Sequence, residues 1–137
     1  MDNFLLQDWI TLRMAGTVPS ITQSEPNWLS CEAFQDVVFF LEVQDIVVGG
    51  TATALQMNYE TAPTKDETLF APMATAISLN PASPPTRTIV TPILLAQNPD
   101  VPLARWVRWR LQPDLLPGAP WAATFRIHCA VNARGVR

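Results

Sequence analysis

Apolar and polar residues alternate along several short stretches of this chain, and that spacing predicts β-strands. The clearest strand spans residues 37–48, where β-branched and aromatic residues dominate. Its two faces are Phe39, Leu41 and Val43 on one side and Phe40, Glu42 and Gln44 on the other. Gly49-Gly50 follows and predicts a two-residue hairpin turn, because glycine permits positive φ at both positions. The next strand, residues 51–60, would then bury one face and keep the other, with Gln56, Asn58 and Glu60, in water.

Further strands follow from the same alternation. The remaining segments with strand character are residues 9–14, 73–79, 88–95, 104–111 and 121–132. Pro92 restricts residues 88–95 to an edge or bulged strand. Residues 61–70 form a polar loop in which Asp66 and Glu67 begin a single helical turn. Thirteen prolines in 137 residues leave no room for a long helix outside the N-terminal region.

The last two strands predict which side chains face the core. In residues 104–111 the inward positions are Val107, Trp109 and Leu111. The outward positions, Trp106, Arg108 and Arg110, form a stripe of the residue types that dominate protein interfaces. In residues 121–132 the inward positions are Phe125, Ile127, Cys129 and Val131.

Many short strands separated by turn signals predict an all-β chain, namely an antiparallel β-sandwich of jelly-roll-like form. The length predicts a single domain over residues 1–137. Pro19 and the polar residues 20–27 interrupt the apolar pattern, so residues 1–25 are predicted to form an extended N-terminal arm that reaches a neighbouring subunit.

The charge composition argues against several function classes. The net charge is −3, and Lys65 is the only lysine beside eight arginines, so the basic stripe that nucleic-acid binding needs is missing. No apolar run is long enough to cross a membrane, and the acidic start predicts no signal peptide. Scarce lysine and five tryptophans favour a surface covered by other subunits, although a genome rich in arginine codons would give the same bias.

The candidates for chemistry are few. Cys31 and Cys129 are predicted to be buried free thiols, with a disulfide between them left open. His128 is the only histidine, and its neighbour Cys129 faces the other side of the strand, so only a pairing with Cys31 would form a dyad. No metal or phosphate-binding motif is present, and we predict no enzymatic activity and no cofactor.

Three segments carry a resemblance to known proteins: WLSCEAFQDVVFFLEV at 28–43, YETAPTKDETLF at 59–70, and PLARWVRWRL followed by WAATFRI between 102 and 127. Together they resemble small β-sandwich structural proteins of tailed bacteriophages, prophages and phage-like particles. The resemblance implies a non-enzymatic virion component, assembled in the bacterial cytoplasm. Such a component would be a head decoration protein on the major capsid protein or another particle protein, or else a tail or connector accessory.

The expected partners are therefore particle proteins and further copies of the chain, with neither nucleic acid nor membrane. The interface candidates are Trp28, Trp106, Arg108, Arg110 and Trp121. The alternative is a carbohydrate-binding module, in which exposed tryptophans stack on sugar rings and a glycan is bound. Core filling or subunit contact is the other interpretation of these aromatic residues.

Overall fold

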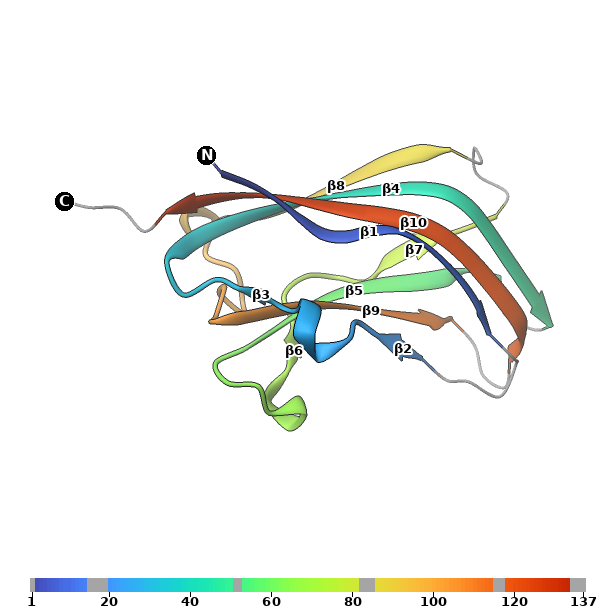
Figure 1. The fold of residues 1–137 in the computed structure, drawn as a ribbon, viewed down its shortest axis with the longest axis horizontal. Helices are drawn as coiled ribbons and strands as arrows, with labels where there is room; N and C mark the ends of the chain where they lie inside the picture. The colour runs from blue at the N-terminus through green and yellow to red at the C-terminus, as the bar shows by residue number, and fades with distance from the viewer. Residues whose placement is uncertain (1, 15–19, 51–52, 82–85, 115–117, 134–137) are drawn as a thin grey trace.

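Two antiparallel sheets pack face to face in the computed structural model, which describes residues 2–14, 20–50, 53–81, 86–114 and 118–133 (Figure 1). Sheet A contains, in spatial order, β1 (Asp2–Met14), β10 (Gly118–Ala133), β4 (Phe34–Gly50) and β8 (Arg87–Ile93). Sheet B has the order β2 (Ile21–Thr22), β9 (Trp106–Pro113), β5 (Leu55–Ala62) and β6 (Ala71–Pro72). In addition, β3 (Leu29–Ser30) pairs with β9 and β7 (Ile77–Leu79) pairs with β5.

Three single-turn 3₁₀ helices lie between the strands, namely η1 (Glu25–Asn27), η2 (Glu67–Leu69) and η3 (Leu95–Gln97). Among the described residues, no helix is long and apolar enough to cross a membrane. The chain is an all-β sandwich, so the predicted fold class is confirmed. Its finer jelly-roll form stays a prediction.

One core runs between the two sheets and is rich in aromatic contacts. Phe39 of β4 stacks on Tyr59 of β5 with ring centroids 3.9 Å apart, and Trp109 of β9 meets Phe125 of β10 edge to face at 5.1 Å. Trp109 is only 2% exposed. The inward positions predicted for β9 and β10 are all buried, so alternation placed these side chains correctly.

The predicted Gly49-Gly50 hairpin is wrong. Strand β4 runs through both glycines and pairs with β10 and β8, whereas β5 belongs to the other sheet. A tight turn would have kept β4 and β5 side by side in one sheet. Because the chain instead passes from sheet A to sheet B, the apolar faces of β4 and β5 cover each other, as the Phe39–Tyr59 stack shows.

The N-terminal segment also differs from its prediction. Residues 2–14 are not an arm but the edge strand β1, which pairs with β10 of the same chain from Asp2 to Met14. Leu6 and Leu12 are buried in the core, which is why this segment packs on its own domain. The strand predicted at residues 9–14 is confirmed as part of β1. Pro19 lies outside the described residues.

Other predictions changed in detail. The predicted strand 73–79 shortens to β7, whereas β8 is an edge strand as Pro92 indicated. The single helical turn is confirmed as η2, where the Asp66 side chain accepts a hydrogen bond from the Thr68 backbone N–H. The prediction that one face of β5 is exposed to solvent is wrong, since Asn58 and Glu60 are 7% and 4% exposed.

Candidate interaction surface

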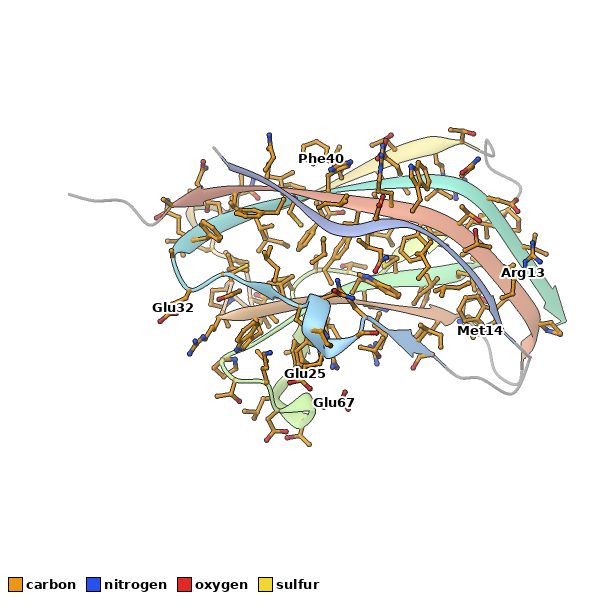
Figure 2. The ribbon with its side chains drawn as sticks, in the orientation of Figure 1. Arg13, Met14, Glu25, Glu32, Phe40 and Glu67 are labelled. Carbon is orange, nitrogen blue, oxygen red and sulfur yellow. The ribbon has the colours of Figure 1, made fainter. Side chains whose placement is uncertain are left out.

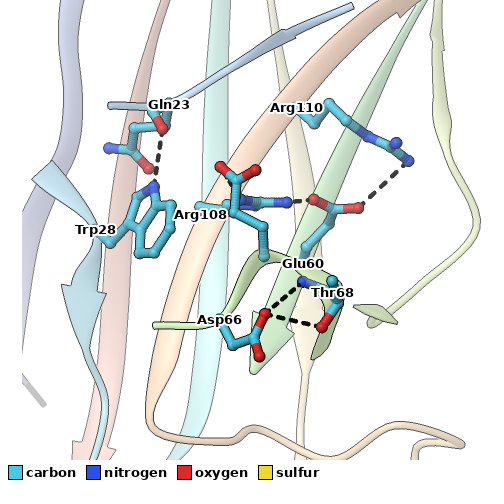
Figure 3. A network of polar contacts seen from close by, with 8 residues as sticks. Gln23, Trp28, Glu60, Asp66, Thr68, Arg108 and Arg110 are labelled. Carbon is cyan, nitrogen blue, oxygen red and sulfur yellow. Dashed lines mark hydrogen bonds and ion pairs between the residues drawn. The ribbon is translucent and has the colours of Figure 1, made fainter. Parts of the chain in front are cut away.

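The middle of the outward stripe of β9, at Arg108, belongs to a buried ion-pair network and is not a free surface. The Nε of Arg108 donates to Oε1 of Glu60 on the neighbouring strand β5 at 3.0 Å. The other carboxylate oxygen of Glu60 lies 3.3 Å from Nη2 of Arg110, so one acid holds two guanidinium groups (Figure 3). Arg108 is only 7% exposed, so its predicted place in an outward stripe available to a partner is wrong.

Two loops cover this part of sheet B. The guanidinium carbon of Arg108 lies 3.8 Å from the ring centroid of Phe70, which follows η2, and 5.2 Å from the ring of Trp28, which follows η1. The two rings meet edge to face at 4.8 Å, and the indole N–H of Trp28 donates to the backbone oxygen of Gln23 at 2.8 Å. Arg108 therefore ties both loops to the sheet through cation–π contacts and ion pairs.

The five interface candidates separate into two groups. Trp28, Arg108 and Trp121 are buried in this chain, at 7%, 7% and 2% exposure, so they do not form an exposed contact surface. Arg110 and Trp106 are partly exposed. The ring of Trp106 carries two cations, with Lys65 Nζ 4.4 Å and Arg105 Cζ 5.4 Å from its centroid. We call Trp106, Lys65 and Arg105 the Trp106 surface.

The thiols and the histidine do not meet. Cys31 and Cys129 are free and buried in the core, which confirms buried free thiols and makes the alternative of a disulfide wrong for this structure. Burial raises the pKa of Cys31 to about 12 and raises the pKa of Cys129 as well. His128 points instead to the outer side of sheet A, toward Glu42, so the Cys31–His128 dyad does not form. Among the described residues, no group of three metal-ligating side chains comes together.

On the outer face of sheet A, one row of side chains is apolar on β1, β4 and β8 and has a histidine on β10. Register places Leu5 of β1, His128 of β10, Phe40 of β4 and Val90 of β8 side by side. Leu5 and Val90 are 48% and 53% exposed. Phe40 lies on the side of the sheet away from sheet B (Figure 2). The next row consists of Asn3, Ala130, Val38 and Pro92.

A polar cluster lies beside these rows. Glu42 accepts a hydrogen bond from Nε of Arg126 on β10 at 2.5 Å, and Nε2 of His128 is 3.4 Å from the same carboxylate oxygen. The hydrogen bond from Arg126 lowers the pKa of Glu42. The guanidinium of Arg126 in turn lies over the ring of Trp9, 4.8 Å from its centroid. These contacts hold the charged side chains of Arg126 and Glu42 in place on the two central strands of the outer face.

The two outer faces of the sandwich are thus covered differently. Loops with η1 and η2 lie on the sheet B side, whereas no described segment lies over β10 and β4 on the outer side of sheet A (Figure 1). Phe40 was assigned to the outward side of its strand but not recognised as part of a surface. The available signal was the unbroken apolar run of residues 37–41, which makes both faces of β4 apolar.

The chain matches no protein-family model and no curated protein. The surface must therefore be interpreted from its own residues.

Proposed function

We propose that this protein is a non-enzymatic structural component of a phage or phage-like particle, a head decoration protein that docks on the capsid lattice. The three sequence segments that resemble such proteins support this proposal. The observation that carries the first part of it, a structural role in contact with other proteins, is the set of apolar side chains Leu5, Phe40 and Val90 in one row on the outer face of sheet A. Contiguous apolar surface that a chain does not cover itself is typical of protein–protein contact sites.

A decoration protein needs a contact with the lattice, and the Trp106 surface supplies suitable groups. Trp106 combines a half-buried ring with two neighbouring cations, and Arg and Trp are the residue types most enriched at interface hot spots. On a lattice the same contact repeats many times, so a weak single contact is reinforced by multivalency. We assign the contact with the capsid lattice to the Trp106 surface. The outer face of sheet A is assigned to a different protein–protein contact.

Co-sedimentation of the purified chain with particles from its host tests the proposal. We expect binding in a fixed molar ratio to the capsid protein. Trp106→Ala should weaken it at least tenfold, because a hot-spot residue contributes about 2 kcal/mol or more. Trp9→Ala removes an exposed tryptophan outside the Trp106 surface and serves as the matched control. If the wild-type chain remains in the supernatant at all concentrations, the proposal is wrong.

The carbohydrate-binding alternative has one observation in its favour. Trp9 is 43% exposed and lies beside Arg126, and an aromatic ring next to a polar donor is what a sugar ring requires. However, Trp28 and Trp121, two tryptophans that such a site would expose, are buried. Binding to a glycan array that Trp9→Ala abolishes, without binding to particles, would favour this alternative.

A further inference from the structure

We infer that the outer face of sheet A binds a second copy of this chain, with the two A sheets face to face. The two-fold axis lies in the interface, runs parallel to the strands, and passes over the line between β10 and β4. This inference rests on the proposed function in one respect, since both assign this face to contact between proteins. It adds the identity of the partner. Lattice binding and self-association are measured separately, so each can fail alone.

The strand order makes such a pairing possible. Sheet A has the order β1-β10-β4-β8, so two strands lie on each side of a line between β10 and β4. A two-fold axis along that line places β10 of one copy over β4 of the other, and β1 over β8. Strand direction is preserved by this rotation, so every row of one copy lies over the same row of the other. Sheets in sandwiches pack in this aligned manner, about 30° apart.

In this dimer, an outward residue of β10 in one copy faces a residue of β4 in the other copy. That residue is the same one that it pairs with on β4 of its own chain. The cross-strand pairs of these rows are Asn132–Asp36, Ala130–Val38, His128–Phe40 and Arg126–Glu42. They combine an amide with an acid, two apolar side chains, an imidazole with an aromatic ring, and a base with an acid. Because β10 and β4 are exchanged by the axis, the same complementary combinations recur between the two copies.

The charges distinguish this axis from the alternative orientation. Arg126 of one copy faces Glu42 of the other, and the reverse contact forms at the same time. An axis in the same plane but perpendicular to the strands would bring β10 onto β10, and near that axis it would oppose Arg126 with Arg126. Like charges at an interface cost several kcal/mol by rough estimate, whereas opposite charges fix its register.

The exposed apolar side chains fit the same axis. Leu5 on β1 and Val90 on β8 lie in one row, at the two edges of the sheet and each one strand away from the central pair. The rotation brings Leu5 of one copy onto Val90 of the other, twice per dimer. The two exposed residues of this row therefore cover each other, as an isologous interface requires.

The size of the surface is adequate for a reversible dimer. Four strands about 4.8 Å apart and three to four rows about 6.8 Å apart give a planar area of roughly 450 Å². Interdigitated side chains raise the accessible area that is buried toward the ~800 Å² per partner of a standard interface. We therefore expect a dimer that dissociates on dilution.

Sedimentation velocity of the purified chain over a range of concentrations tests the inference. We expect a monomer–dimer equilibrium that Leu5→Lys weakens at least tenfold. Leu69→Lys is the matched control, because Leu69 is also 48% exposed but lies on η2 at the other side of the molecule. A wild-type chain that is monomeric at every concentration, or a dimer that Leu5→Lys leaves unchanged, would overturn the inference.

A charge-exchange experiment tests the axis itself. Glu42→Arg and Arg126→Glu should each abolish homodimers, because four like charges then meet at the interface. Mixed in equal amounts, the two variants should form a heterodimer, in which Arg126 faces Glu42 and the introduced charges also face each other. Circular dichroism confirms that each variant is folded before mixing. Failure of the mixture to dimerise, while both variants are folded, contradicts the proposed axis.

Discussion

Arg108 shows how a charged side chain becomes part of a protein interior. Its guanidinium lies on the rings of Phe70 and Trp28 and pairs with Glu60, whose own exposure is 4%. Burying a charge is costly unless it is paired and hydrogen-bonded. Here the pairing and the aromatic rings offset that cost, and they hold two loops against sheet B.

Arg108→Ser should destabilise the fold by about 3–5 kcal/mol, because it leaves the buried carboxylate of Glu60 with fewer partners. Arg105→Ser is the matched control: its ion pair with Glu32 is exposed, and such pairs contribute about 1 kcal/mol or less. Urea unfolding followed by fluorescence measures both. Equal stability of the two variants would show that the network does not stabilise the loops.

Glu42 should make the stability of the folded chain depend on pH in the acidic range. The hydrogen bond from Arg126 lowers its pKa below the ordinary value of 4.5 in the folded state. The contact therefore stabilises the fold above about pH 4.5, and this stabilisation is lost as the pH falls through the folded-state pKa. Melting temperatures between about pH 7 and pH 3 should fall less steeply for Glu42→Gln than for the wild type. Parallel curves would contradict this role.

Alternation along β9 correctly assigned Arg108 and Trp109 to opposite sides of the sheet. It did not predict that other segments cover the outer side. The covering groups come from loops distant in sequence, at Trp28 and Phe70. The two-residue period of a strand predicts on which side of the sheet a side chain lies. It does not predict whether a loop covers that side. For this reason the candidate stripe could not be recognised as buried from sequence.

At the scale of elements, β1 is an integral strand whose irregular pairing decides which leucines are buried. The register with β10 shifts between Leu5 and Gln7, and Leu6 is 4% exposed beside the exposed Leu5. Leu6→Ala should cost about 2–5 kcal/mol through lost burial and a cavity. Leu5→Ala, its neighbour, should change the stability of the monomer by about 0.5 kcal/mol or less.

Chemical denaturation at concentrations below dimerisation compares the two leucine variants. If the Leu6 variant is as stable as the Leu5 variant, β1 does not belong to the folded core. Deleting residues 2–14 should then leave a folded domain, whereas an integral β1 predicts unfolding.

The crossing from β4 to β5 marks a limit of prediction at this scale. Both strands were recognised from their residues, but Gly49-Gly50 permits a tight turn as well as the end of a long strand. What decides between them is the packing partner of β4, and that partner, β10, is distant in sequence: Cys129 pairs with Phe39, which lies 90 positions before it. Local turn signals contain no information about that partner.

For the whole molecule, the buried thiols report on global unfolding. Burial raises the pKa of Cys31 to about 12, so at about pH 8 only about one thiol in ten thousand is a thiolate. Both cysteines should react with a thiol reagent only when the sandwich opens, at the rate of unfolding. Ser30→Cys places a thiol at an exposed neighbouring position and should react within the mixing time. Rapid reaction of the wild-type thiols would mean that the core opens locally.

Sheet A also imposes an order of events during synthesis. Strand β10 lies between β1 and β4 and is the partner of both, and within the described residues β1 pairs with β10 alone. Residues 2–14 leave the ribosome well before residues 118–133, so they wait with unpaired backbone and exposed apolar side chains until β10 emerges. Strand β4 can pair with β8 earlier, but its other edge also waits for β10. Such long-range pairing slows folding and exposes strand edges to aggregation. The nascent chain should therefore depend on protection by a chaperone until its last strand has been translated.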